Sequence, residues 1–150
     1  MSTKMNLKLI LILSVSHLFM DVTGSALPAI MPFFKAALSL NYAQIGSVIM
    51  VSNLTSSIIQ PCFGYLSDRM QIKWLLPVSV LLTYGGFSLV GLAPSYGLLL
   101  TFVVIAGMGV AVYHPESFKI THHFTGNRMA TGMSLFQVGG NFGMAFGPLW

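Results

Sequence analysis

Apolar residues run along this chain in long blocks that few charged side chains interrupt. Three stretches hold no Asp, Glu, Lys or Arg at all, namely residues 36–67, 74–115 and 129–150. About 20 apolar residues cross the hydrocarbon core of a bilayer as a helix, and the longer stretches contain turn signals such as Ala-Pro-Ser-Tyr-Gly at 93–97. The pattern predicts an all-α membrane protein with about five transmembrane helices, near residues 9–34, 43–65, 74–93, 98–117 and 131–150.

Composition agrees with lipid as the main solvent. Charged residues make up 7% of the chain and hydrophobic residues 55%, whereas roughly a quarter of the residues in a soluble domain are charged. A single soluble core in 150 residues would leave too few polar groups to cover it. The predicted loops are short and hold no soluble domain, so any function is expected among the helices.

Basic residues predict the orientation, because Lys and Arg concentrate in cytoplasmic loops. With the N-terminus in the cytoplasm, six of the seven basic residues lie inside and Lys35 lies outside. The net charge of +4 then reflects topology, and no cluster of bases indicates nucleic-acid binding. A cleaved signal peptide is the disfavoured alternative, since the apolar block continues past Asp21. The six inside residues are Lys4, Lys8, Arg69, Lys73, Lys119 and Arg128.

Enzyme motifs are incomplete. Gly-Met-Gly at 107–109 lacks the third glycine of a dinucleotide fingerprint, and no Pro-Cys-x-x-Cys follows His-Pro-Glu at 114–116. His122 and His123 are expected in a loop near the headgroups rather than in a metal site, and the single Cys62 excludes an internal disulfide. We therefore predict no enzyme, no cofactor and no metal.

Asp21 lies inside the first predicted helix, where an ionisable side chain must be paired, hydrated or protonated. His17 precedes it by one turn and shares its face, and Ser14, Gly24 and Ser25 extend this polar stripe. The pair is either a structural contact between helices or a proton or substrate site. We favour the second, because an imidazole beside a carboxylate can change charge near neutral pH.

His114 and Glu116 are further candidates for proton coupling at the end of the fourth predicted helix. They lie about 200° apart around a regular helix, so they share a face only if Pro115 disturbs it. In the structural alternative, Glu116 reaches the interface and pairs with Lys119.

Amide side chains recur in the second and fifth predicted helices. Asn53 and Gln60 in the second, and Gln137 and Asn141 in the fifth, are candidates for lining a substrate cavity. The alternative is that they form hydrogen bonds that hold helices together.

Glycine recurs every fourth residue in the fifth predicted helix, at Gly139, Gly143 and Gly147, with Pro148 next. Glycines at this spacing strip one face of side chains and allow another backbone to approach closely. Such a face serves tight packing, and it also suits packing that must slide or reseal.

The stretch Gly64-Tyr65-Leu66-Ser67-Asp68-Arg69, with Lys73 after it, resembles the loop between helices two and three of the major facilitator superfamily. That motif reads G-x-x-x-D-R/K-x-G-R/K-R/K. This chain departs from it at 71 and 72, where Gln and Ile replace a glycine and a base, which affects the charge network of the loop but not its Asp68–Arg69 core.

Other stretches are similar to the fosmidomycin resistance group of bacterial efflux transporters within this superfamily. They are SHLFMD at 16–21, YHPES at 113–117 and FQVGGNFG at 136–143, while GMAFGP at 143–148 resembles the G-x-x-x-G-P motif in helix five of drug–proton antiporters. The resemblance implies a twelve-helix transporter of two six-helix halves in the inner membrane. This chain would be an incomplete N-terminal half-domain (residues 1–150) that needs further C-terminal helices, either as a piece of a longer sequence or as the product of an interrupted gene.

By the same resemblance, the expected activity is proton-coupled export of a small drug or metabolite, by antiport and alternating access. Asp21 or Glu116 would take up the proton, and Asp68 with Arg69 would form a gate. Two alternatives remain open: a facilitator or importer on the same fold, and a membrane subunit that transports nothing and uses its carboxylates to hold helices together.

Overall fold

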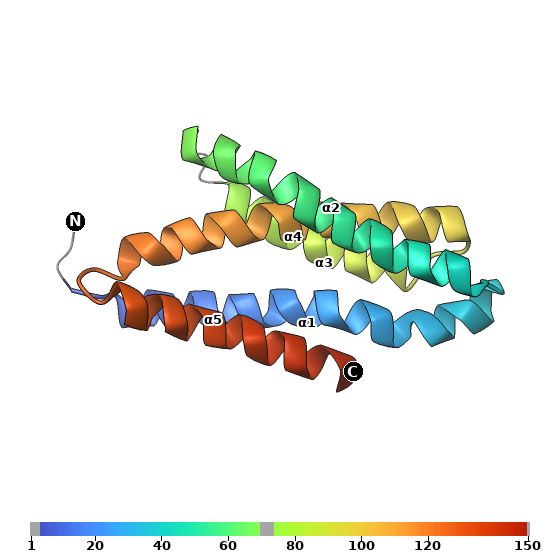
Figure 1. Cartoon of the computed structure of the whole chain (residues 1–150), viewed down its shortest axis with the longest axis horizontal. Coiled ribbons are helices and arrows are strands. Elements are labelled where there is room, and N and C mark those ends of the chain that lie inside the picture. Colours follow the sequence, from blue (N-terminus) through green and yellow to red (C-terminus); the bar gives the residue numbers. More distant parts are fainter. Residues whose placement is uncertain (1–3, 70–73, 150) are drawn as a thin grey trace. The chain divides into compact units, whose positions relative to one another are not determined.

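The computed structural model describes residues 4–69 and 74–149, so Lys73 of the expected gating loop, with Gln71 and Ile72, lies outside the described residues. Within these two ranges the chain forms five α-helices, one short 3-10 helix and no strand (Figure 1). The predicted all-α fold with five helices is confirmed. The helices are α1 (Leu7–Leu38), α2 (Tyr42–Arg69), α3 (Leu75–Val90), α4 (Tyr96–Phe124), α5 (Met129–Phe146) and the 3-10 helix η1 (Gly147–Leu149).

Several helices extend past their predicted ends. α2 runs to Arg69, so Asp68 and Arg69 lie in the last turn of a helix and not in a loop. α4 passes through Pro115 and runs to Phe124, because a proline inside a membrane helix is tolerated where neighbouring groups satisfy the freed backbone. The loop predicted for His122 and His123 is therefore wrong: both lie in the last turn of α4.

Three of the described helices, α1, α2 and α4, are long and apolar enough to cross a membrane by themselves. α3 is apolar but has 16 residues, since it ends at Val90 rather than at the predicted residue 93. Gln137 and Asn141 lower the hydropathy of α5.

The helices pack as two units. One combines the described residues up to Ala26 with those from Glu116 onward, and the other runs from Leu27 to Pro115. The second unit has an apolar core from α1, α2, α3 and α4, which includes Leu27, Met31, Val48, Val90, Leu99 and Val103.

α2 begins with a reciprocal cap. The backbone N–H of Gln44 donates to the side-chain oxygen of Asn41, and the N–H of Asn41 donates to the side-chain oxygen of Gln44, both at 2.9 Å. These bonds satisfy two backbone donors at the start of the helix. The remainder of α2 is open, since Val48 and Ser67 are its buried residues among those described.

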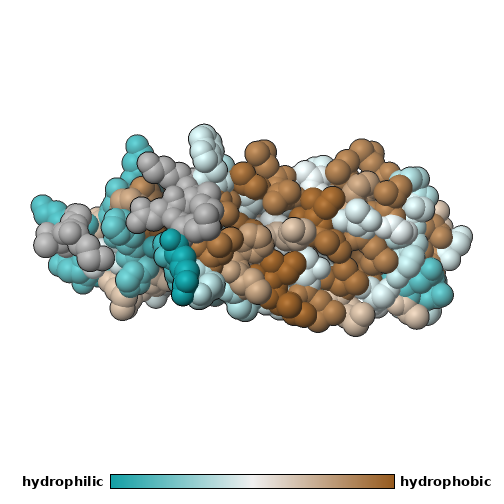
Figure 2. All heavy atoms as spheres, turned by 90° about the horizontal axis from the view of Figure 1, so that it is seen from above, coloured by the Kyte–Doolittle hydropathy of each residue, from teal (hydrophilic) through white to brown (hydrophobic). Residues whose placement is uncertain are grey.

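Hydrophobic side chains cover the middle of the face that carries α2, and hydrophilic side chains gather toward its two ends (Figure 2). Met50, Leu54 and Ile58 on α2 are about half exposed or more. Such a belt suits contact with lipid tails or with other apolar helices.

Candidate functional site between α1 and α5

α5 lies alongside the first half of α1 within the first packing unit (Figure 1). A β-carbon added at Gly139 would overlap the backbone carbonyl of Ser14, and one added at Gly143 would overlap the carbonyl of Leu18. These glycines allow the two backbones to come into direct contact. Gly147 and Pro148, expected within the helix, lie in η1 instead, where Gly147 faces the hydroxyl of Ser25.

Two serine hydroxyls of α1 connect the helices. Ser14 Oγ donates to the carbonyl of Leu135 at 2.7 Å. Ser25 Oγ lies 3.2 Å from the carbonyl oxygen of Gly143 and 2.7 Å from that of Asp21 in its own helix. Each hydroxyl is thereby satisfied without water.

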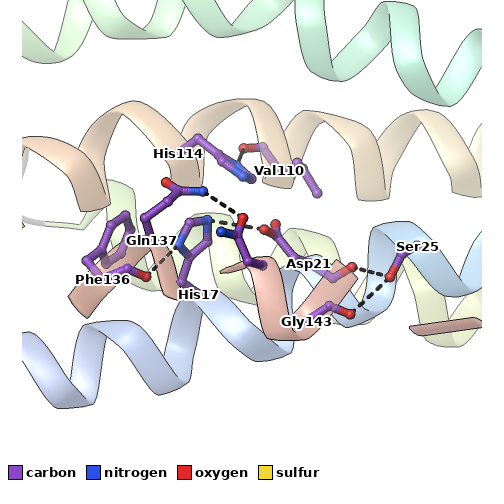
Figure 3. Close-up of polar contacts among 9 residues, drawn as sticks. His17, Asp21, Ser25, Val110, His114, Phe136, Gln137 and Gly143 are labelled. Carbon is purple, nitrogen blue, oxygen red and sulfur yellow. Dashed lines mark hydrogen bonds and ion pairs between the residues drawn. The ribbon is translucent and has the colours of Figure 1, made fainter. Parts of the chain in front are cut away.

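His17 and Asp21 face α5 between these two serines (Figure 3). His17 Nε2 lies 3.3 Å from Asp21 Oδ2, and the two residues are 1% and 7% exposed. The predicted i,i+4 pairing on one helix face is present. Burial matters here, because an ion pair shielded from water interacts far more strongly than one on a surface.

Phe136 on α5 fixes the imidazole of His17 in two ways. Its ring stacks on the imidazole with centroids 4.3 Å apart and 15° between the planes. Its backbone carbonyl oxygen lies 3.2 Å from His17 Nδ1. Phe118 on α4 packs edge-on against Phe136 at 5.1 Å. A carbonyl only accepts hydrogen bonds, so Nδ1 carries a proton in this arrangement.

The tautomer of His17 determines how many protons the pair holds. With Nδ1 protonated, a neutral imidazole has only a lone pair at Nε2, and an ionised carboxylate also only accepts. A proton placed between Nε2 and Oδ2 would turn this contact of two acceptors into a hydrogen bond. The pair is neutral overall with that proton and carries one negative charge without it.

Sequence reasoning gave no role to Phe136. A backbone carbonyl has no sequence signature, and the contact joins residues 119 positions apart. The sequence offered one signal: Phe136 and Gly140 are four residues apart, so they share one face of α5. His17 and Asp21 share one face of α1 for the same reason.

The other candidates for proton coupling are distributed over both units. Glu116 is half-buried on α4 in the unit that contains His17 and Asp21. His114 belongs to the unit that ends at Pro115, where its Nδ1 donates to the carbonyl of Val110 at 3.1 Å.

The amide candidates lie on α5 and α2. Gln137 Nε2 donates to Asn141 Oδ1 at 3.4 Å (Figure 3), so these two act together on α5. On α2, Asn53 is exposed and Gln60 is half-buried.

The expected gating residues lie near the end of α2. Gly64 faces Pro115 of α4, at 3.6 Å between a β-carbon added to the glycine and the Cβ of the proline. The guanidinium of Arg69 lies over the ring of Tyr65 at 4.5 Å. This cation–π contact holds Arg69 along its own helix.

A family model described as Major Facilitator Superfamily matches residues 11–150. The chain belongs to the major facilitator superfamily. Members of this superfamily are transporters, and the apolar helices together with the homologues below indicate a multi-pass membrane protein. The resemblance inferred from the motifs at 64–69 and 143–148 is confirmed.

Among curated proteins the chain is similar to the fosmidomycin resistance protein of Escherichia coli (strain K12), at 39% identity over 137 residues that cover 91% of this chain and 34% of that protein. It is 30% identical to the uncharacterized transporter YfnC of Bacillus subtilis (strain 168) over 141 residues, which are 94% of this chain and 34% of that protein. A probable nitrate transporter of Staphylococcus epidermidis is 24% identical over 121 residues, 81% of this chain and 31% of that protein. The chain spans about a third of the length of these relatives. No solved structure matches it.

Proposed function

We propose that this chain is the leading part of a proton-coupled efflux transporter that exports a small drug or metabolite by alternating access. The buried pair of His17 and Asp21 supports the proposal, because an imidazole 3.3 Å from a carboxylate at the contact between two helices is a suitable place to share and release a proton. The similarity to a fosmidomycin resistance protein supports a drug as the substrate. The protein would lie in the inner membrane with its N-terminus in the cytoplasm, and further C-terminal helices would complete the substrate cavity.

In this mechanism a proton from outside neutralises the pair, and its release inside leaves one negative charge on it. An uncompensated charge at membrane depth is unfavourable by several kcal/mol, so the two protonation states favour different arrangements of the helices around Asp21. Substrate leaves when the cavity opens outward, and proton release resets the inward-facing state. Glu116 is the second candidate for this role.

Asp68 and Arg69 would act as a gate at the cytoplasmic end of α2. The gate holds when these charges pair with the ends of neighbouring helices and opens when they part. The guanidinium of Arg69 lies over the ring of Tyr65. On opening, the guanidinium would exchange its contact with a helix end for this contact with Tyr65.

Inverted membrane vesicles test the proposal with fosmidomycin as the probe. Adding the drug should dissipate a preformed proton gradient in vesicles that contain the protein. Asp21→Asn should lower this proton flux at least tenfold, since an asparagine cannot take up a proton. Glu116→Gln, tested in parallel, distinguishes the two carboxylates. Full efflux and full proton coupling in both variants would reject the proposed roles.

A facilitator or importer of a small anion is the second candidate, and the similarity to a probable nitrate transporter favours it. It predicts drug-independent uptake of nitrate into right-side-out vesicles, with no dissipation of the gradient when fosmidomycin is added to inverted ones.

A further inference from the structure

Two helical turns face each other across the α1–α5 interface. One presents His17 and Asp21, and the other presents Phe136 and Gly140, each pair four residues apart. We propose that Gly140 is a positioning residue of the proton site: its lack of a side chain leaves the space in which the imidazole and the carboxylate meet. The proposal rests on the proton-binding function proposed above for the pair.

The space over Gly140 is filled by the pair itself. A β-carbon added there would lie 2.5 Å from His17 Cε1, and 2.7 Å from both His17 Nε2 and Asp21 Oδ2. Carbon atoms pack at about 3.5–4.0 Å, so a methyl group at this position displaces one partner or both. The two atoms that share the proton are the ones it would displace.

Gly140 differs from its neighbours in what it contacts. A β-carbon at Gly139 would meet the backbone carbonyl of Ser14 first, and one at Gly143 that of Leu18, with Ser14 Oγ and Asp21 Cβ also within 3 Å. Those glycines permit the approach of two backbones. The three atoms nearest to a β-carbon at Gly140 all belong to side chains of the pair, so its role is separable from helix packing.

Gly140 also lies next to both atoms of the contact, since a β-carbon built on it would come within 2.7 Å of Nε2 and of Oδ2. Phe136 holds one side of the imidazole by stacking, and the backbone of α5 at Gly140 lies against the other end of the pair. An alanine would push the imidazole and the carboxylate apart, so the two groups would no longer share one proton.

Titratable groups on the surrounding elements define the controls. α5 contributes none, because Met129–Phe146 holds no acidic, basic, histidine, tyrosine or cysteine residue. α4 carries Tyr96, Tyr113, His114, Glu116, Lys119, His122 and His123. The pH profile of proton flux in Gly140→Ala is therefore compared with the profile in Glu116→Gln. This comparison establishes whether the pair or Glu116 determines the profile.

The first test is the pH dependence of drug-driven proton flux, measured on the protein as its gene encodes it. Gly140→Ala should shift or broaden the profile by about one pH unit, while Gly139→Ala lowers the amount of folded protein but leaves the shape of the profile unchanged. Gly24→Ala is the matched control, since nothing lies within 4 Å of its added β-carbon. Identical profiles in all three variants would overturn the proposal.

If Gly140→Ala folds poorly, a double-mutant cycle that measures the free energy of unfolding tests the proposal instead. The penalty of Gly140→Ala should largely disappear in the background His17→Ala/Asp21→Ala, because the clashing atoms are gone. The penalty of Gly139→Ala should persist there, since its clash is with backbone. An undiminished penalty for Gly140→Ala would assign this glycine to helix packing alone.

The two proposals fail in different ways. If Asp21→Asn retains proton coupling, the proton-binding function of the pair is wrong whatever Gly140 does. If Asp21→Asn abolishes coupling but Gly140→Ala behaves like Gly139→Ala, only the positioning role is wrong.

Discussion

His17 and Asp21 illustrate at the residue scale how a membrane protein accommodates a carboxylate. The two side chains lie 3.3 Å apart, and Phe136 supplies both an aromatic face and a hydrogen-bond acceptor to the imidazole. Removing one partner of a buried charge pair costs about 3–5 kcal/mol, because the other is left uncompensated. This arrangement gives the backbone of Phe136 and its ring distinct roles.

We expect Phe136→Leu to separate these roles. Leucine loses the stacking with His17 and the edge contact with Phe118 but keeps the backbone carbonyl that fixes the tautomer. Thermal unfolding should show a loss of about 1–3 kcal/mol, with the pH profile of proton flux unchanged. A profile altered as in Asp21→Asn would show that the ring, rather than the carbonyl, controls the proton.

Ser39 provides a second prediction, because it adopts a left-handed conformation with φ of +53° at the end of α1. The N–H of Leu40 donates to the carbonyl of Lys35 at 3.1 Å, which is the bond of a helix C-cap that usually contains glycine. Ser39→Gly should stabilise the protein by about 1 kcal/mol. Ser39→Ala, which retains the β-carbon, should give no increase in melting temperature.

At the element scale, closely packed helices depend on particular glycines and not on glycine content. Gly85 and Gly86 are neighbours on α3. Nothing lies within 4 Å of a β-carbon added at Gly85, whereas a β-carbon added at Gly86 would lie 2.6 Å from the backbone nitrogen of Ala106 on α4. A backbone atom cannot move aside as a flexible side chain does. The two positions therefore form a matched pair.

Gly86→Ala should destabilise the contact between α3 and α4 by about 1–3 kcal/mol through overpacking. Gly85→Ala should be neutral or stabilising by up to about 1 kcal/mol, because alanine favours a helix more than glycine does. The melting temperatures of the two purified variants test this difference in stability. Equal destabilisation by both variants would contradict the packing of α3 on α4.

At the scale of the whole molecule, α2 is the most open of the long helices. Val48 and Ser67 are its buried residues in the described part of the chain, while Asn53 is exposed and Gln60 half-buried. A lipid-facing amide is unfavourable because it loses its hydrogen bonds to water. Under the proposed function, these amides face a hydrated cavity that further helices complete.

Cysteine labelling tests the proposed orientation. In a background with Cys62→Ala, a cysteine at Asn41 between α1 and α2 should react with a membrane-impermeant maleimide added to intact spheroplasts. A cysteine at Asn127 between α4 and α5 should react only after the membrane is opened. The reverse pattern would place the N-terminus outside and contradict the positive-inside assignment.

The sequence by itself determined the number of helices, the membrane environment and the family. Hydropathy depends on the local run of residues, and the family motifs are contiguous, so neither requires a tertiary contact. It also placed His17 and Asp21 on one face, since helical spacing fixes this. The end of α4 was placed too early, because the charge-free run ends at Pro115, whereas the helix continues to Phe124 and the turn lies at Gly126-Asn127.

Only the tertiary structure decided what the pair of His17 and Asp21 contacts. The carbonyl of Phe136 and the glycine at position 140 come from a helix more than a hundred residues away, and no local pattern encodes such a distance. The structure likewise separated Gly140, which faces side chains, from Gly139, which faces backbone. Adjacent glycines look alike in a sequence, and only the atoms opposite them distinguish their roles.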